Sequence, residues 1–268
     1  MEACIILLRH AERLDRAMED QGLDWIQSAP FPQDPPLSDF GCQQAHGVGM
    51  IMKNMSLTHI YSSPMIRTVM TSAIISNHIV PPLPLWIENG LIEEAKSFRG
   101  RTPNEPKPVW IDGKVHQSPS YLKDNISDLV DLSHSSLQEV THSPDHMAKN
   151  EIRENHETLL DAIEITRDRC SQFISKLMKK HQGSPEGFRI LCVGHGATCS
   201  GCSRALEEGL PDDLKIRGER LVGCWARYIP LDESNLNGPW YSPEGVWQSL
   251  GTDGRIASEN VADRGIEM

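Results

Sequence analysis

One short segment near the start of the chain constrains the fold more than any other. Residues 5–8 are four consecutive aliphatic residues, and the charged or polar side chains of Arg9, His10, Glu12 and Arg13 follow directly. An apolar run without polar alternation is typical of a strand buried on both faces, as in the parallel sheet of an α/β protein. Because open α/β sheets bind ligands at the carboxyl ends of their strands, these residues indicate an anion site with a nucleophile or a base. The alternative at this point is a strand that ends in solvated charges.

The rest of the chain alternates between apolar runs and segments of helical periodicity. This alternation predicts a sheet with helices on both faces. Strands are predicted at residues 57–61, 83–87, 188–193 and 221–231, with a final edge strand near Trp240 and Trp247. Helices are predicted at residues 38–55 with Ser38 as N-cap, 64–78 with Ser63 as N-cap, 154–181 and 197–208.

Composition excludes several classes of partner. The net charge of −11 argues against binding to nucleic acid or to an anionic membrane, because both require a basic face. No apolar stretch approaches the roughly 20 residues of a membrane span. Since the first predicted strand starts within a few residues of Met1, no cleavable signal is expected.

Cysteine usage indicates a reducing compartment. Seven cysteines, an odd number, favour free thiols and a cytoplasmic location. Cys199 and Cys202 form a C-x-x-C pair, but no second pair accompanies it. A zinc site is therefore not expected, and packing at a helix end is favoured over a redox centre.

We expect one domain over residues 1–268 with two irregular parts. Residues 95–150 are polar and contain several prolines, which predicts an insertion of loops and short helices over the sheet edge, with a lid as one role. Its histidines, His134, His142 and His146, lack metal-ligand spacing and are interpreted as surface residues. The composition from residue 251 onward predicts a flexible tail.

Further reactive side chains stand at similar positions along the chain. Like His10, His195 directly follows an apolar run, and the glycines on either side of it permit close approach of a backbone. Arg67 lies in the first turn of a predicted helix, where a cation opposes the helix dipole. A nearby anion therefore explains an arginine at this position better than a solvent-exposed side chain without a role. Glu93 follows another predicted strand and could donate a proton to a leaving group. Arginine and histidine together would neutralise a dianion and supply an imidazole as nucleophile or base.

Five motifs in order carry a resemblance to a known family. They are L-R-H-A-E-R at 8–13, P-L-S-D-F-G at 36–41, Y-S-S-P-M-I-R-T at 61–68, G-L-I-E at 90–93 and V-G-H-G at 193–196. Together they resemble the signature of the histidine phosphatase (phosphoglycerate mutase-like) superfamily. The R-H-x-E-R start is most similar to the phosphatase domains of the suppressor of T-cell receptor signalling and ecdysteroid-phosphate phosphatase type.

This resemblance implies a fold and a set of roles. The fold would be a three-layer α/β/α sandwich with a mixed, mostly parallel sheet. His10 would be the nucleophile that forms a phosphohistidine, and Glu93, rather than its neighbour Glu94, would be the general acid. Neither a metal nor a cofactor is implied. The phosphoryl oxygens would be held by Arg9, Arg13, Arg67 and His195.

The resemblance also implies a metal-independent phosphomonoester hydrolase. Its substrate would be a phosphorylated small molecule or a phosphoprotein such as one carrying phosphotyrosine, and relatives suggest a homodimer. The walls of the substrate pocket are expected from residues 15–36 and 95–150, and neither segment contains a motif that names a ligand. Ala11 stands where the family usually has glycine, so its methyl group either crowds the phosphate or is absorbed by a small shift.

Three alternatives compete with hydrolysis through a histidine nucleophile. A phosphomutase of the same superfamily is disfavoured because Arg13 replaces the small hydroxyl residue of the mutase pattern. A noncatalytic module that binds phosphorylated ligands would not need His10 or Glu93. A cysteine phosphatase is excluded by spacing, because its loop places five residues between Cys and Arg, whereas four separate Cys4 from Arg9 and Cys199 from Arg204.

Overall fold

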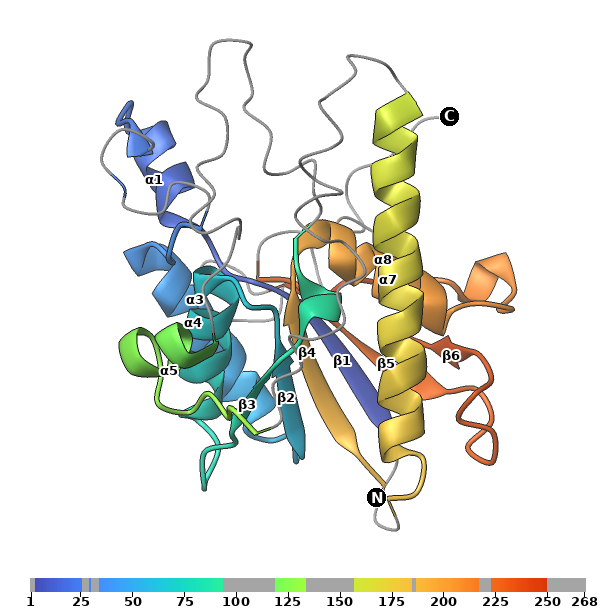
Figure 1. The fold of residues 1–268 in the computed structure, drawn as a ribbon. Coiled ribbons are helices and arrows are strands. Elements are labelled where there is room, and N and C mark those ends of the chain that lie inside the picture. The colour runs from blue at the N-terminus through green and yellow to red at the C-terminus, as the bar shows by residue number, and fades with distance from the viewer. Residues whose placement is uncertain are drawn as a thin grey trace.

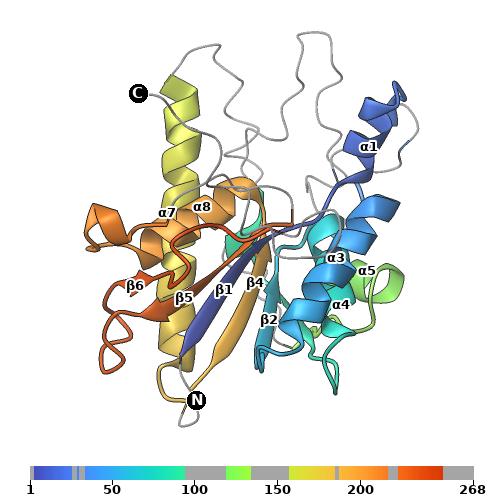
Figure 2. The same ribbon diagram turned by 180° about the vertical axis from the view of Figure 1, so that it is seen from behind.

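A six-stranded sheet in the order β3-β2-β4-β1-β5-β6 lies between helices on both faces (Figure 1 and Figure 2). The structure is a computed structural model, and it describes residues 3–25, 29, 34–93, 119–133, 157–184, 187–216 and 223–249. The architecture is the three-layer α/β/α sandwich that the sequence analysis predicts.

Most strands of the sheet run parallel. In the order of the sheet, β3, β2, β4 and β1 form parallel pairs, β5 is antiparallel to β1, and β6 is antiparallel to β5. The predicted mixed, mostly parallel sheet is therefore confirmed. The strands are β1 (Cys4–Arg9), β2 (His59–Ser62), β3 (Leu85–Ile87), β4 (Arg189–Gly194), β5 (Trp225–Pro230) and β6 (Trp240–Tyr241).

The helices form the two outer layers. In both views α7 and α8 lie on one side of the sheet, and α3, α4 and α5 lie on the other (Figure 1 and Figure 2). The α-helices are α1 (Leu14–Asp20), α3 (Asp39–Met52), α4 (Ile66–Ser76), α5 (Pro119–Asn125), α7 (Glu157–His181) and α8 (Gly196–Leu206). Two short 3-10 helices are η1 (Asn89–Leu91) and η3 (Asp212–Leu214).

Strand β1 is buried on both faces, as its apolar run predicts. Ile5 and Leu7 belong to the core cluster that includes residues of α7 and α8. Cys4, Ile6 and Leu8 belong to the cluster that includes residues of α3 and α4. Strands β4 and β5 also pair with the two edges of β1. Polar side chains are therefore found at the carboxyl end of β1, where Arg9 and His10 lie.

The helix starts confirm one predicted cap and contradict another. The hydroxyl of Ser38 accepts the N–H of Gly41 at 2.9 Å, so Ser38 caps α3 as predicted, although this helix ends at Met52 rather than near residue 55. The predicted cap at Ser63 is wrong, because α4 begins at Ile66 and its N-cap residue is Met65, which makes no side-chain cap bond. The sequence does not predict helix α1 either, since its residues follow a loop-like pattern.

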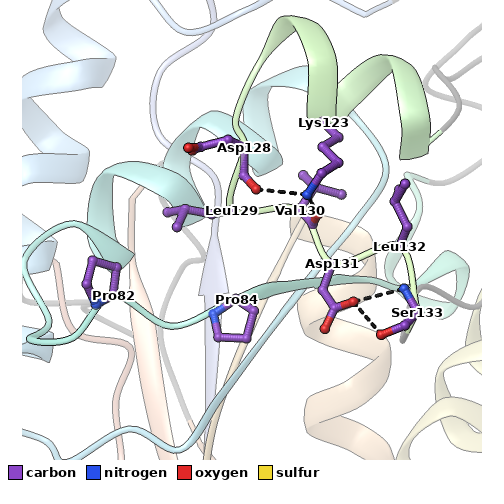
Figure 3. Close-up of a pocket in the computed structure, with 9 residues that line it drawn as sticks. All are labelled: Pro82, Pro84, Lys123, Asp128, Leu129, Val130, Asp131, Leu132 and Ser133. Carbon is purple, nitrogen blue, oxygen red and sulfur yellow. Dashed lines mark hydrogen bonds between the residues drawn. The ribbon is translucent and has the colours of Figure 1, made fainter.

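The described residues 119–133, which belong to the predicted insertion, lie against the edge of the sheet. Leu85 of β3 donates its N–H to Leu129 O at 2.8 Å and accepts the N–H of Asp131 at 2.9 Å. A pocket of about 460 Å³ lies at this edge. Its lining residues come from the prolines before β3, from Lys123 of α5 and from the segment after α5 (Figure 3). The predictions for residues 95–118 and 134–150, and for the tail from 251, fall outside the described residues.

Helix α7 is long but carries charges along its exposed face. Within the described part of the chain, no helix combines the length and apolarity needed to cross a membrane. The helix begins at Glu157, three residues after the predicted start at 154, and its end at His181 is as predicted.

Gly41 gives a test of how closely α3 packs against the chain after β1. A Cβ at this position would lie 2.2 Å from the carbonyl oxygen of Glu12, a backbone atom that cannot turn away. We expect Gly41→Ala to lower the free energy of unfolding by about 1–3 kcal/mol, as overpacking does. Urea unfolding of the wild type and of Gly41→Ala measures this difference in free energy.

Gly183→Ala is the matched control, because no heavy atom lies within 4 Å of the Cβ it would add. This change should alter the unfolding free energy by less than about 0.5 kcal/mol. Equal effects of the two substitutions would contradict the close packing at Gly41.

Candidate active site

The sheet topology brings the predicted site residues together at one edge, the upper edge of the sheet in Figure 1. Arg9 ends β1 and His10 follows it, while His195 directly follows β4, the parallel neighbour of β1. Arg67 lies in the first turn of α4 after β2, and Glu93 follows β3 and η1. Since β1, β4, β2 and β3 are parallel neighbours, their carboxyl ends meet at this edge.

His10 is buried and held in one tautomer. Its Nδ1 lies 2.7 Å from the carbonyl oxygen of Ala11, which can only accept, so Nδ1 carries the proton and Nε2 carries the lone pair. Burial lowers the pKa of His10 well below its ordinary value, and the nearby Arg67 and His195 lower it further. The imidazole is therefore neutral at pH 7 and presents a nucleophilic nitrogen. Its ring centre lies 5.1 Å from that of His195.

His195, Glu93 and Arg67 form a compact buried cluster. Glu93 Oε2 lies 3.2 Å from His195 Nδ1 and 3.5 Å from Arg67 Nη2, and Arg67 Nη2 lies 3.3 Å from His195 Nδ1. Burial lowers the pKa of His195 to about 4. Burial alone would raise the pKa of Glu93, but His195, Arg67 and His10 together hold it well below its usual range. Without an anion present, Glu93 is thus ionised and His195 is neutral.

The other two predicted arginines differ in their surroundings. Arg9 packs beside the start of α8, because a Cβ on Gly196 would lie 3.6 Å from its Cζ. Arg13 is partly exposed and forms a two-point ion pair with Asp15, through Nε at 2.8 Å and through Nη2. Burial would lower the pKa of Arg13, but Asp15 raises it above its ordinary value. Because Arg13 bonds to Asp15 and not to the His10 cluster within the described residues, its role as a phosphate ligand stays a prediction.

Asp34 is a site residue that the sequence analysis does not identify. Its Oδ1 accepts the N–H of Ile66 at 2.8 Å and lies 3.5 Å from Arg67 Nη1, so this carboxylate, not Ser63, caps α4. Its Oδ2 is buried without a hydrogen-bond partner among the described residues. Burial raises the pKa of Asp34 to about 7, against the opposing effects of Arg67 and the Ile66 N–H. No local signal marks this residue, because its contacts are formed with a helix 32 and 33 positions further along the chain.

Ala11 fits the site without crowding it. Its side chain packs in a small cluster with Leu37 and Ala45. Its N–H donates to the hydroxyl of Thr71 at 3.3 Å, and its carbonyl accepts from His10. The methyl group is thus part of the core, and the departure from the family's glycine is absorbed.

The cluster also contains the donor set of a metal site. His10, Glu93 and His195 offer three ligand atoms within 4.8 Å of one another, a combination that zinc uses. Arg67 Nη2, however, lies 3.3 Å from His195 Nδ1 and 3.5 Å from Glu93 Oε2, so a dication would face a buried guanidinium. The charges therefore favour an anion at this place, and the expected independence of metal stays a prediction.

Comparisons with known proteins agree with this geometry. The sequence profile of the histidine phosphatase superfamily (branch 1) matches residues 5–114. Ubiquitin-associated and SH3 domain-containing protein B of Mus musculus is 27% identical over 245 residues, which cover 79% of this chain and 33% of that protein. The chain thus spans about a third of the length of this curated relative. The probable phosphoglycerate mutase GpmB of Yersinia pestis (strain Pestoides F) is 25% identical over 254 residues, which cover 92% of each chain.

Solved structures show the same fold. The ecdysone phosphate phosphatase from Bombix mori, in complex with tungstate, has a TM-score of 0.55 and 18% sequence identity, with 90% of this chain and 91% of that chain covered. A phosphoglycerate mutase from Bacillus anthracis has a TM-score of 0.52 and 16% identity, with 90% and 91% covered. At these identities the likeness establishes the architecture.

The buried Asp34 predicts an unusual dependence of stability on pH. Its pKa rises from 3.8 in the unfolded chain to about 7 in the folded protein, so between these values the folded protein binds a proton that the unfolded chain has released. Its contribution to stability therefore falls as the pH rises through this window, by about 1.4 kcal/mol for each step of one in pH. Asp34→Asn cannot titrate and should gain stability relative to the wild type from about pH 4 to pH 7. Urea unfolding across this range measures the difference.

Asp15→Asn is the control with the opposite sign. Burial would raise the pKa of Asp15, but Arg13 holds it below its usual range, so its contribution is present above the unfolded pKa and is lost as pH falls. This variant should lose stability relative to the wild type as pH rises. A constant difference between Asp34→Asn and the wild type across the window would refute the raised pKa.

Proposed function

Since the chain is a member of the histidine phosphatase superfamily, we propose that it hydrolyses phosphomonoesters through a phosphohistidine on His10. The observation that carries the proposal is the tautomer of His10. Its Nδ1–H is bound by the Ala11 carbonyl, so the lone pair of Nε2 is available at the sheet edge where Arg67 and His195 gather. A neutral imidazole beside buried cationic donors is the arrangement that attack on a phosphoryl dianion requires.

The first step would transfer the phosphoryl group to the protein. The bond between His10 Nε2 and phosphorus forms as the bond from phosphorus to the ester oxygen breaks, and the leaving oxygen takes a proton from Glu93. Arg67 and Arg9, with His195 as a hydrogen-bond donor, would stabilise the charge on the phosphoryl oxygens. Water then attacks phosphorus and gives a proton to Glu93, the bond from phosphorus to His10 Nε2 breaks, and free phosphate leaves.

Glu93 must gain a proton before it can act as an acid. In the free protein its pKa lies well below the ordinary value because of His195, Arg67 and His10. A bound phosphoryl dianion would compete for the same Arg67 and repel the carboxylate, and both effects raise the pKa of an acid. Substrate binding itself would thus favour the protonated form that the first step consumes.

A phosphomutase is the second candidate, favoured by the likeness to GpmB over 92% of both chains. It would share the phosphohistidine but return the phosphoryl group to a second hydroxyl of the substrate rather than to water. The products distinguish the two functions. A phosphatase releases inorganic phosphate, whereas a phosphomutase moves the phosphoryl group to another hydroxyl of the same phosphorylated hydroxy acid. A noncatalytic binding module would retain oxyanion affinity and release no phosphate.

Substrate, assembly and location are further parts of the proposal. We propose a phosphorylated small molecule or a phosphoprotein as substrate, on the basis of the resemblance alone. The homodimer is likewise a proposal, which sedimentation of the purified chain would test. No disulfide forms among the described residues, which include all seven cysteines, and five of these lie in one core cluster. This usage supports a reducing, cytoplasmic compartment.

Replacing His10 tests the covalent route. We expect His10→Ala to lower kcat/KM for p-nitrophenyl phosphate by at least about a thousandfold, because the nucleophile is removed. The fold should persist, since the side chain lies at the end of a strand and outside the two large core clusters. Thermal unfolding checks the fold, and tungstate binding checks the anion site. Ordinary turnover by the pure variant would place the nucleophile elsewhere.

Replacing Glu93 tests proton donation to the leaving group. A poor leaving group needs a proton, whereas an activated one departs without it. We therefore expect Glu93→Gln to depress hydrolysis of phenyl phosphate far more than hydrolysis of p-nitrophenyl phosphate. Steady-state kinetics on both esters measures the contrast.

Glu88→Gln is the matched control in the same turn. Glu88 Oε1 accepts the N–H of Gly90 at 2.9 Å, and a glutamine keeps this acceptor. The control should change both rates by less than about tenfold, which corresponds to about 1.4 kcal/mol in the barrier. Equal loss on both esters in Glu93→Gln would assign the proton transfer to another group. Glu94, the neighbouring carboxylate, lies outside the described residues.

A further inference from the structure

The hydroxyl of Ser63 contacts the catalytic cluster rather than a helix end. Ser63 follows the last residue of β2, and the residue is fully buried. Its Oγ lies 2.9 Å from Nε2 of His195, which is 132 positions further along the chain. Among the described residues, its other hydrogen-bond partner is the N–H of Met65 at 3.4 Å. Since Met65 rather than Ser63 is the N-cap residue of α4, the bond to His195 is the main contribution of this side chain.

Three neighbouring groups bear on the direction of this bond. At Nδ1 of His195, the ionised Glu93 Oε2 can only accept and lies 3.2 Å away, whereas Arg67 Nη2 can only donate and lies 3.3 Å away; the shorter contact with the carboxylate favours a proton on Nδ1. Ser63 Oγ already accepts the N–H of Met65, which leaves its O–H free to donate. A neutral imidazole has one N–H, and Nε2 is therefore an acceptor. Ser63 must then donate its O–H to Nε2. The result is a directed chain in which Ser63 donates to His195 and His195 donates to Glu93.

Independent bonds hold the backbones at both ends of this contact. The N–H of Ser63 donates to Val193 O at 3.0 Å, and its carbonyl accepts the hydroxyl of Thr68 at 2.8 Å. The N–H of His195 donates to the hydroxyl of Thr198 at 2.8 Å, and its carbonyl accepts the N–H of Cys199 at 2.8 Å. Removing the Ser63 hydroxyl therefore leaves the strand end and the start of α8 in place.

We propose that Ser63 is a positioning residue that selects the Nδ1–H tautomer of His195 and keeps that N–H directed at Glu93 and the phosphoryl site. The effect of this positioning role on turnover rests on the proposed hydrolase function. The tautomer of His195 can be measured whether or not the protein is a hydrolase. The low pKa of His195, about 4, agrees with a neutral ring that needs a tautomer to be chosen. Without the hydroxyl, Nε2 becomes a buried acceptor without this donor, and the proton can move to either nitrogen.

The first readout is the tautomer itself, which requires no activity. Long-range ¹H–¹⁵N NMR of ¹⁵N-histidine-labelled protein reports which ring nitrogen carries the proton, and His195→Ala assigns the signals. We expect the wild type to show the Nδ1–H form of His195. Ser63→Ala should lower the population of this form, because Nε2 loses its donor while Arg67, which can only donate, still competes with Glu93 at Nδ1. Ser63→Thr, which keeps a hydroxyl, should restore the wild-type signal.

The matched control is Ser62→Ala, in the neighbouring residue. Ser62 is as buried as Ser63, but its hydroxyl donates to the backbone carbonyl of Ser63 at 3.0 Å rather than to His195. We expect the Ser62→Ala spectrum to match the wild type. A general loosening of the strand end would instead shift both variants together.

The second readout is turnover of p-nitrophenyl phosphate. We expect Ser63→Ala to lower kcat/KM by at least about tenfold, in the range of effects seen when an oriented donor is lost. Ser62→Ala should change it by less than about threefold, and Ser63→Thr should recover most of the loss. Inhibition by tungstate should weaken in parallel with kcat/KM in Ser63→Ala, because His195 then presents its N–H to the oxyanion for only part of the time.

The outcomes separate this proposal from the proposed function. An Nε2–H tautomer of His195 in the wild type overturns the proposal, even if Ser63→Ala fails to fold. The same holds if Ser63→Ala and Ser62→Ala share one spectrum and one rate. If Ser63→Ala shifts the tautomer but the wild type releases no phosphate from any ester, the positioning role stands and the hydrolase fails. If the wild type is an active hydrolase and Ser63→Ala matches Ser62→Ala, the hydrolase stands and the positioning role fails.

Discussion

The arrangement of the site depends on the compensation of one buried cation. The guanidinium of Arg67 is 1% exposed, and burying an unpaired charge would cost several kcal/mol. Asp34 lies beside Nη1 and Glu93 beside Nη2, and the two carboxylates come from segments before α3 and after β3. The cation thereby ties both segments to the start of α4. In the proposed reaction, an oxyanion would meet a donor that is already oriented, which is the condition for strong electrostatic stabilisation.

The sheet and the convergence of the main side chains can be predicted because they follow from local pattern and topology. The apolar run of β1 stops where the sheet ends, so Arg9 and His10 have to lie at the carboxyl edge, where open α/β sheets in general bind ligands. The same reasoning places His195 after β4, and parallel pairing of β1 with β4 brings the two histidine rings to 5.1 Å. Strand ends and helix faces are properties of short segments, and the sequence carries them directly.

The partners of the polar side chains cannot be predicted, because they depend on segments that only the fold brings together. A serine before a proline is a good local signal for a helix cap, yet the hydroxyl of Ser63 finds His195, and Asp34 supplies the cap. The two-point ion pair of Arg13 with Asp15 is likewise a contact that the sequence analysis does not predict, while the role of Arg13 as a phosphate ligand stays a prediction. In each case a tertiary or neighbouring partner outweighs the local preference.

The pairing of Leu85 with the segment around Val130 has a consequence for how copies of this chain meet. An open edge strand exposes N–H and C=O groups to which another chain can add a strand, and this is a common route to aggregation. Here the N–H and C=O of Leu85 are both taken, and the prolines at 81, 82 and 84 that precede β3 have no N–H to offer. At Leu85 the edge of the sheet is thus closed to strand addition by a second copy of the chain.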